Sequence, residues 1–113
     1  MRGFNKKVIY LFQSLREKIL SIDENIIEEP KAKYIAYKTS TNFTDIHLQQ
    51  SCVKIYLNVK SGQLNDPKSL ARDLTKPKKI GHWGNGDYEI KLKDEKQIEY
   101  IFELIKHSYN LNR

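Results

Sequence analysis

The chain has 113 residues, of which 39% are hydrophobic and 30% charged, and its formal net charge is +6. This length and composition suit one folded domain over residues 1–113 and exclude a wholly disordered chain. Its one cysteine, Cys52, excludes an internal disulfide, and no apolar run reaches the roughly 20 residues that span a bilayer. We therefore expect a cytoplasmic protein that does not associate with a membrane.

The first predicted element is an amphipathic helix over residues 4–21. Its apolar residues recur at intervals of three and four, which places them on one helical face. These residues are Phe4, Val8, Leu11, Phe12, Leu15 and Ile19. Residues 21–33 follow as a connector, in which Pro30 favours extended geometry for the residue before it.

Three strands are predicted next, over residues 31–38, 43–49 and 53–60. Alternation gives the second strand two faces, with Thr44, Ile46 and Leu48 on one and Phe43, Asp45 and His47 on the other. In the third strand, four aliphatic residues alternate with Lys54, Tyr56, Asn58 and Lys60. Because the connections between these strands are short, we expect antiparallel neighbours.

Asp66 and Pro67 predict a short internal helix. An aspartate can accept hydrogen bonds from the free amides of a first helical turn, and proline loses no hydrogen bond at the next position. Further along, Asn85-Gly86 favours the type I′ turn of a hairpin. The segment that leaves this turn alternates charged residues with Tyr88, Ile90 and Leu92, as a half-buried strand does.

A last helix begins after Asp94, with Gln97 as the reciprocal partner of a capping box, and ends near Asn110. The order of elements predicts a two-layer α+β fold. In it, N-terminal and C-terminal helices and one short internal helix accompany an antiparallel sheet of four or five strands.

Basic residues gather in two segments. Residues 1–21 hold five basic residues and one acidic residue, and residues 60–81 hold six basic and two acidic. Such clusters attract polyanions, although a lysine-rich soluble surface has the same composition. The second cluster precedes an aromatic, glycine-rich stretch, so a nucleic-acid interface there would use Arg72, Lys76, Lys78, Lys79, His82 and Trp83. The alternative for Trp83 is a place in the core beneath the turn.

A metal-dependent nuclease is the catalytic alternative. Glu89 and Lys91 are two residues apart and share one face of a strand with Asp87, and Asp45 could approach from a neighbouring strand. Alternating charges on the solvent side of an ordinary strand give the same pattern. No close His or Cys spacing supports a metal site, and we predict no cofactor.

The segments "NFTDIHLQQSCVKIYLNVK", "LNDPKSLARDLT" and "GHWGNGDYEIKL", with a helix ending in "LIKHSY", resemble an uncharacterised bacterial and archaeal family labelled as a domain of unknown function. The resemblance runs from about Ile27 to Tyr109. Longer members of that family carry the catalogue name "predicted transport protein", and the domain often follows restriction-type nuclease modules. The resemblance implies a nucleic-acid-processing or defence context and supplies no catalytic residues.

These observations favour a non-catalytic accessory or binding module. Its expected partners are nucleic acid or a nuclease-type protein. A homodimer formed through an exposed sheet edge is a further alternative.

Overall fold

The computed structural model of the chain describes residues 3–76 and 86–113. Its elements, in chain order, are α1 (Lys6–Leu20), β1 (Ile27–Pro30), β2 (Ile35–Lys38), β3 (Asn42–Leu48), β4 (Val53–Leu57), β5 (Arg72–Asp73), β6 (Tyr88–Leu92), a 3-10 turn (Glu95–Gln97) and α2 (Ile98–Asn112). All six strands form one sheet in the order β1-β2-β3-β4-β6-β5, and every neighbouring pair is antiparallel.

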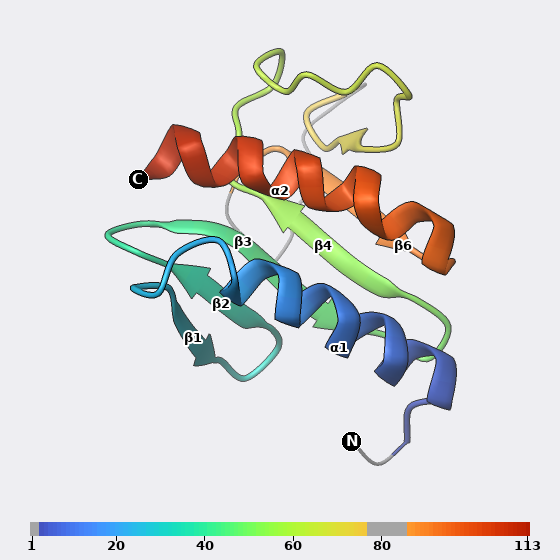
Figure 1. Ribbon diagram of the computed structural model, residues 1–113. Coiled ribbons are helices and arrows are strands. Elements are labelled where there is room, and N and C mark those ends of the chain that lie inside the picture. Colours follow the sequence, from blue (N-terminus) through green and yellow to red (C-terminus); the bar gives the residue numbers. More distant parts are fainter. Residues whose placement is uncertain (1–2, 77–85) are drawn as a thin grey trace.

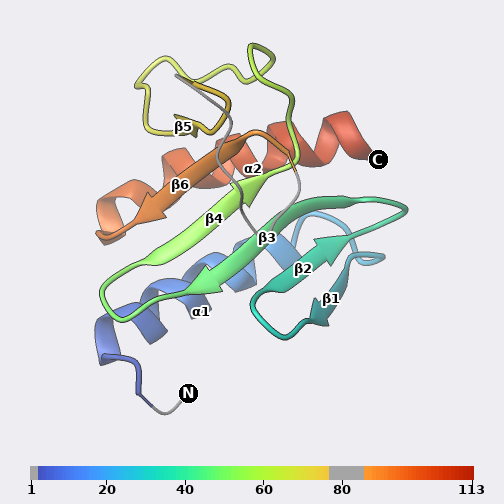
Figure 2. The same ribbon diagram turned by 180° about the vertical axis from the view of Figure 1, so that it is seen from behind.

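Both helices pack against the same face of this sheet (Figure 1). In the described residues, the opposite face carries no helix (Figure 2). The predicted α+β fold is therefore confirmed, with six strands in place of four or five. We call the face under the helices the inner face and the opposite one the outer face. No helix within the described residues is long and apolar enough to cross a membrane.

α1 buries the predicted stripe of apolar residues, but it begins later than expected. The side chain of Asn5 accepts a hydrogen bond from the Val8 amide at 2.8 Å, which caps the helix. Phe4 therefore lies before the first turn and is half-buried against the core. This position brings Phe4 close to the ends of β2 and β3.

The capping box at the start of the last helix is confirmed. Asp94 accepts from the Lys96 amide, and the Gln97 side chain accepts from the Asp94 amide at 3.1 Å. A 3-10 turn follows this cap and leads into α2, which continues to Asn112. Its buried stripe completes the core between the helices and the inner face.

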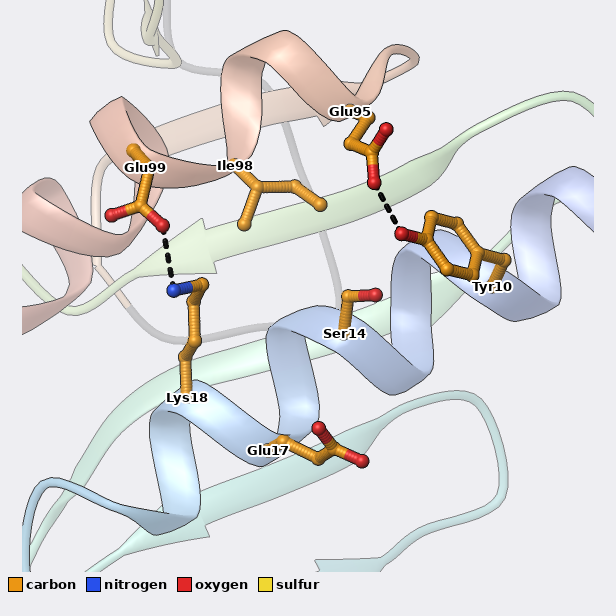
Figure 3. A pocket seen from close by; sticks show the side chains of 7 residues that line it. All are labelled: Tyr10, Ser14, Glu17, Lys18, Glu95, Ile98 and Glu99. Atoms are coloured by element: carbon orange, nitrogen blue, oxygen red, sulfur yellow. Dashed lines mark hydrogen bonds and ion pairs between the residues drawn. The ribbon is translucent and has the colours of Figure 1, made fainter.

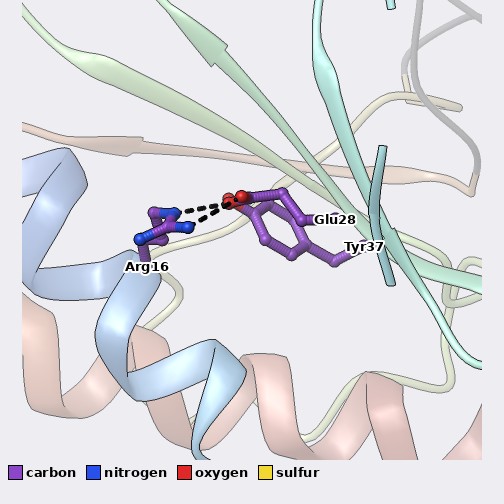
Figure 4. Close-up of polar contacts among 3 residues, drawn as sticks. All are labelled: Arg16, Glu28 and Tyr37. Atoms are coloured by element: carbon purple, nitrogen blue, oxygen red, sulfur yellow. Dashed lines mark hydrogen bonds and ion pairs between the residues drawn. The ribbon is translucent and has the colours of Figure 1, made fainter. Parts of the chain in front are cut away.

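β1 lies within the segment that the sequence assigned to a connector. It pairs with β2 alone and is an edge strand, where Pro30 is tolerated. Glu28 of β1 faces the helices and accepts two hydrogen bonds from Arg16, at 2.6 and 2.9 Å, and one from the Tyr37 hydroxyl at 2.6 Å (Figure 4). A half-buried acidic residue in a short strand gives no alternating apolar pattern, so the strand was missed.

Phe43 was expected on the same face as Asp45, and the structure corrects this. The register between β2 and β3 shifts between Tyr37 and Lys38, as a β-bulge does. Phe43 is fully buried in the core, and its ring meets that of Tyr109 edge-on at 5.3 Å between centroids. The bulge thus adds an aromatic residue to the core at the start of β3.

The predicted internal helix is absent from residues 61–76, where the structure has turns and β5. Asp66 does accept backbone hydrogen bonds, from Leu70 at 3.2 Å and Ala71 at 2.8 Å. Ser69, which lies between Asp66 and these two donors in the chain, has a positive φ of 52°, which is not a helical conformation. The carboxylate therefore closes a loop and does not begin a helix, and the loop delivers Arg72 to the sheet.

β6 confirms the predicted strand after the glycine-rich stretch, with Tyr88, Ile90 and Leu92 buried. Gly86 has a φ of +85°, as a turn glycine should. Its backbone passes so close to β4 that an added Cβ would lie 2.1 Å from the Leu57 carbonyl oxygen. Asn85 lies outside the described residues, so the type I′ turn stays a prediction.

Candidate functional site

Three basic side chains form a row across the outer face. The strand register sets His47 of β3 directly opposite Lys54 of β4, and Lys54 directly opposite Lys91 of β6. Neighbouring strands lie about 4.8 Å apart, so consecutive members of the row are close neighbours. Like charges directly opposite each other destabilise a sheet. We call these three residues the basic row.

A second row lies beside the basic row and is largely buried. It runs through Asp45, Tyr56, Glu89 and Arg72, which face one another across β3, β4, β6 and β5. Asp45 is 1% exposed, Tyr56 3% and Glu89 8%. Burial and the nearby Glu89 carboxylate raise the pKa of Tyr56 to about 12, so this phenol stays protonated at neutral pH.

Both buried carboxylates of this second row have protein partners. The Lys54 ammonium lies 3.6 Å from Glu89, and the Asn42 side-chain amide donates to Asp45 at 3.0 Å. A buried charge with partners is less costly than one without. These two acids therefore lie on the floor of the outer face, and Arg72 and Lys91 are exposed beside Glu89.

A pocket of about 330 Å³ opens where β5 ends beside β6. Its lining consists of Leu70, Arg72, Glu89, Lys91, Lys93 and Gln97. The three cationic side chains are exposed, and among the residues that the structure describes none of them has an ion-pair or hydrogen-bond partner. We call this hollow the edge pocket. Its unpaired cations suit an anionic group of a ligand.

The structure describes only part of the predicted nucleic-acid site. Arg72 lies in the edge pocket, and Lys76 is exposed in the turn after β5. The other four residues of that prediction lie outside the described residues: Lys78, Lys79, His82 and Trp83. Their role as a contact tip stays a prediction.

The residues of the nuclease alternative are brought together in part. Asp45, Glu89 and Lys91 share the outer face, as alternation predicted for them. Asp87 has a structural contact instead, because its carboxylate accepts from the Ser61 amide at 2.9 Å. In residues 3–76 and 86–113, no group of three or more His, Cys, Asp or Glu side chains could hold a metal ion.

Lys54, Lys93 and His47 were missing from the predicted site. Alternation had placed Lys54 and His47 on the outer sides of their strands. Nothing in the sequence indicated which residue of one strand faces which residue of the next. The site depends on that register.

A different hollow, of about 440 Å³, lies between the two helices (Figure 3). Tyr10 donates a hydrogen bond to Glu95 on one side of it, and Lys18 pairs with Glu99 at 2.6 Å on the other. Glu17 adds a third carboxylate to the lining. This groove is acidic, so it would repel the polyanion that the edge pocket suits.

Comparisons with known proteins place the chain among relatives. The family model described as "Domain of unknown function (DUF5655)" matches residues 2–112. An "Uncharacterized protein" of Haemophilus influenzae is 41% identical over 98 residues, which make up 87% of this chain and 32% of that relative. The chain thus spans about a third of the length of this curated relative. No solved structure matches the chain.

Proposed function

We propose that this chain, which belongs to the family described as "Domain of unknown function (DUF5655)", is a non-catalytic module that binds nucleic acid through the outer face of its sheet. One observation carries the proposal. Exposed Arg72, Lys91 and Lys93 converge on one pocket, and no carboxylate outside that pocket pairs with them in the described residues.

The outer face has the electrostatics that phosphates require. Its rim at the edge pocket is cationic, whereas Asp45 and Glu89 are buried and have partners. A third carboxylate, Glu29 of β1, lies at the other end of the same row and pairs with two lysines. Arginine presents a planar fork that matches a phosphate, and lysine supplies a mobile point charge. By contrast, Arg16 and Lys18 of α1 already pair with glutamates.

We further propose that the module serves a nucleic-acid-processing or defence system, with a nuclease-type partner. The matched relative is about three times as long as the region that it shares with this chain. In such a protein, this domain would hold the nucleic acid while the reaction takes place on another part of the chain or on a partner.

Fluorescence anisotropy with labelled oligonucleotides tests the proposal. The R72Q/K91Q/K93Q triple variant should weaken binding and reduce the salt dependence, by about 0.7 to 0.9 in the slope of log K against log salt for each phosphate that the variant no longer neutralises. The K6Q/K7Q/K96Q variant is the matched control, because it removes the same charge from exposed positions outside the edge pocket. Failure of the wild type to bind at low salt, or equal losses of affinity in both variants, would refute the proposal.

A second candidate function is metal-dependent cleavage, because the register brings Asp45, Glu89 and Lys91 to one face. Incubation with DNA or RNA and Mg²⁺ or Mn²⁺ tests it directly. Cleavage by the wild type that disappears in Glu89→Gln would favour this candidate. Intact substrate under all these conditions would leave the binding module as the function.

A further inference from the structure

A third hollow, of about 300 Å³, lies at the far end of the basic row from the edge pocket. Its polar and aromatic lining comes from Phe4, Lys31, Lys33, Tyr34 and His47, and its aliphatic wall includes Ile35 and Leu48. We call it the aromatic pocket. Ile35 and Leu48 belong to the inner face, whereas His47 belongs to the basic row, so the pocket lies at the end of β3, where the two faces meet.

The two aromatic residues lie next to hydrogen-bonded backbone, and their side chains are not fully covered. Tyr34 stands at the end of the turn between β1 and β2, which the Lys31 amide closes by donating to the Tyr34 carbonyl at 2.8 Å. Its side chain is half-buried, as is that of Phe4, which the neighbouring cap at Asn5 positions. Rings in this situation offer a face to a planar ligand without losing much side-chain freedom on binding.

The mouth of the aromatic pocket is cationic. Burial lowers the pKa of His47, and the positive charges of Lys54 and Lys33 lower it further. The lowered pKa leaves the imidazole neutral at neutral pH, so the positive charge beside the pocket comes from lysines such as Lys33. An apolar and aromatic pocket beside lysine side chains suits a nucleobase with its phosphate.

On the basis of the proposed function, we infer that the ligand is single-stranded nucleic acid. Its phosphates follow the basic row from the edge pocket, and one unpaired base occupies the aromatic pocket. A duplex keeps its bases stacked and paired, so it would fill the aromatic pocket only after a base had been extruded. The single strand is therefore the preferred ligand, and the preference originates at Tyr34 and Phe4.

Three oligonucleotides of one length separate the base from the phosphates: a single strand, its duplex, and a single strand without bases. Fluorescence anisotropy should show the single strand bound more tightly than either of the others. Tyr34→Ala should weaken binding of the ordinary strand by about 5- to 150-fold, the range expected for one stacked base, and leave the abasic strand unaffected. Tyr34→Phe keeps the ring and should keep the affinity.

The control is Tyr10→Ala, which removes a 52% exposed tyrosine from α1 and should leave the affinity for all three oligonucleotides unchanged. Circular dichroism checks that each variant is folded. If Tyr34→Ala does not fold, the comparison of single strand, duplex and abasic strand on the wild type and on Tyr34→Phe still tests the base pocket. Equal affinity for strand and duplex, or equal losses of affinity on ordinary and abasic strands, would overturn the base pocket and leave phosphate binding intact. Binding of poly-glutamate but of no oligonucleotide would overturn both proposals in favour of an acidic protein partner.

Discussion

Lys54 and Lys91 lie directly opposite each other on β4 and β6. The diagonal neighbour Glu89 offsets this repulsion in part, because its carboxylate is 3.6 Å from the Lys54 ammonium. Lys91 has no such partner in the described residues. A pair of like charges that lowers stability and is only partly compensated is expected where binding requires it.

Lys91→Gln tests that interpretation, because it should affect stability and binding in opposite directions. Removing the repulsion should stabilise the fold by about 0.2–1 kcal/mol in urea denaturation. The same change should weaken oligonucleotide binding and lower its salt dependence. Lys96→Gln, outside the edge pocket, should leave both quantities nearly unchanged. A decrease in stability in Lys91→Gln would show that the lysine has a structural role instead.

Glu28→Gln should destabilise the fold by about 1–2 kcal/mol, since it replaces a charged acceptor of three hydrogen bonds. Arg16 and, to a lesser extent, Tyr37 hold the pKa of Glu28 below its ordinary value, although burial opposes them. The unfolded chain therefore takes up a proton more readily, and this contribution to stability is present above about pH 4.5 and is lost as the pH falls.

Urea denaturation at pH 7 and at acid pH measures both effects of the Glu28 change. Glu29→Gln is the matched control in the same strand, because Glu29 is more exposed than Glu28 and pairs with Lys31 and Lys38. Its effect on stability should be smaller. If the two variants are destabilised equally, Glu28 does not fasten β1 to α1.

Gly86→Ala should destabilise the protein by roughly 2–4 kcal/mol. A side chain at positive φ costs about 1 kcal/mol, and the new Cβ would also collide with the Leu57 carbonyl. Gly62→Ala separates the two causes, because Gly62 has a similar φ of +87° but no atom within 4 Å of its Cβ position. It should cost about 1 kcal/mol. Equal destabilisation in thermal denaturation would mean that the close approach to β4 is relieved at no cost.

The lowered pKa of His47 predicts a pH-dependent stability. Burial, Lys54 and Lys33 all disfavour the imidazolium in the folded state, so the unfolded chain binds this proton more readily. The stabilising contribution is present above about pH 6.5 and is lost as the pH falls through the lowered pKa. In His47→Gln, the free energy of unfolding should depend less on pH over the range in which histidine titrates, which lies well above the range in which carboxylates titrate. Urea denaturation at a series of pH values measures this.

The same histidine gives a readout for ligand binding. A phosphate near the mouth of the aromatic pocket should raise the pKa of His47, because it favours the charged imidazole. Titration by NMR with and without a single-stranded oligonucleotide measures this change. An unchanged pKa would place the ligand away from His47.

The elements that could be predicted from the sequence are those whose own residues carry the pattern. Helical spacing and caps located α1 and α2, and alternation located β4 and β6. β1 could not be found in this way, because Glu28 is fixed by Arg16 and Tyr37 on other elements. Asp66 predicted a helix that does not form, since its carboxylate binds backbone amides equally well in a loop.

For the candidate site, the sequence indicated which residues face outward but not which ones meet. The lysines of β4 and β6 alternate with apolar residues, so their side of the sheet followed from the pattern. That Lys54 meets both His47 and Lys91 depends on the register of three strands. The bulge between β2 and β3 shows how one extra residue changes such a register and moves Phe43 into the core.

The shortness of β5 has a consequence for how copies of this protein meet in solution. β5 covers only Glu89 and Tyr88, and in the described residues no strand continues it along the rest of β6. A bare stretch of strand can pair with its counterpart in another molecule and begin an aggregate. Lys91 and Lys93 are exposed on and just after that stretch, and two such edges would repel each other. The residues that we assign to phosphate binding would therefore also keep the protein dispersed, and a saturating polyanion should make it prone to self-association.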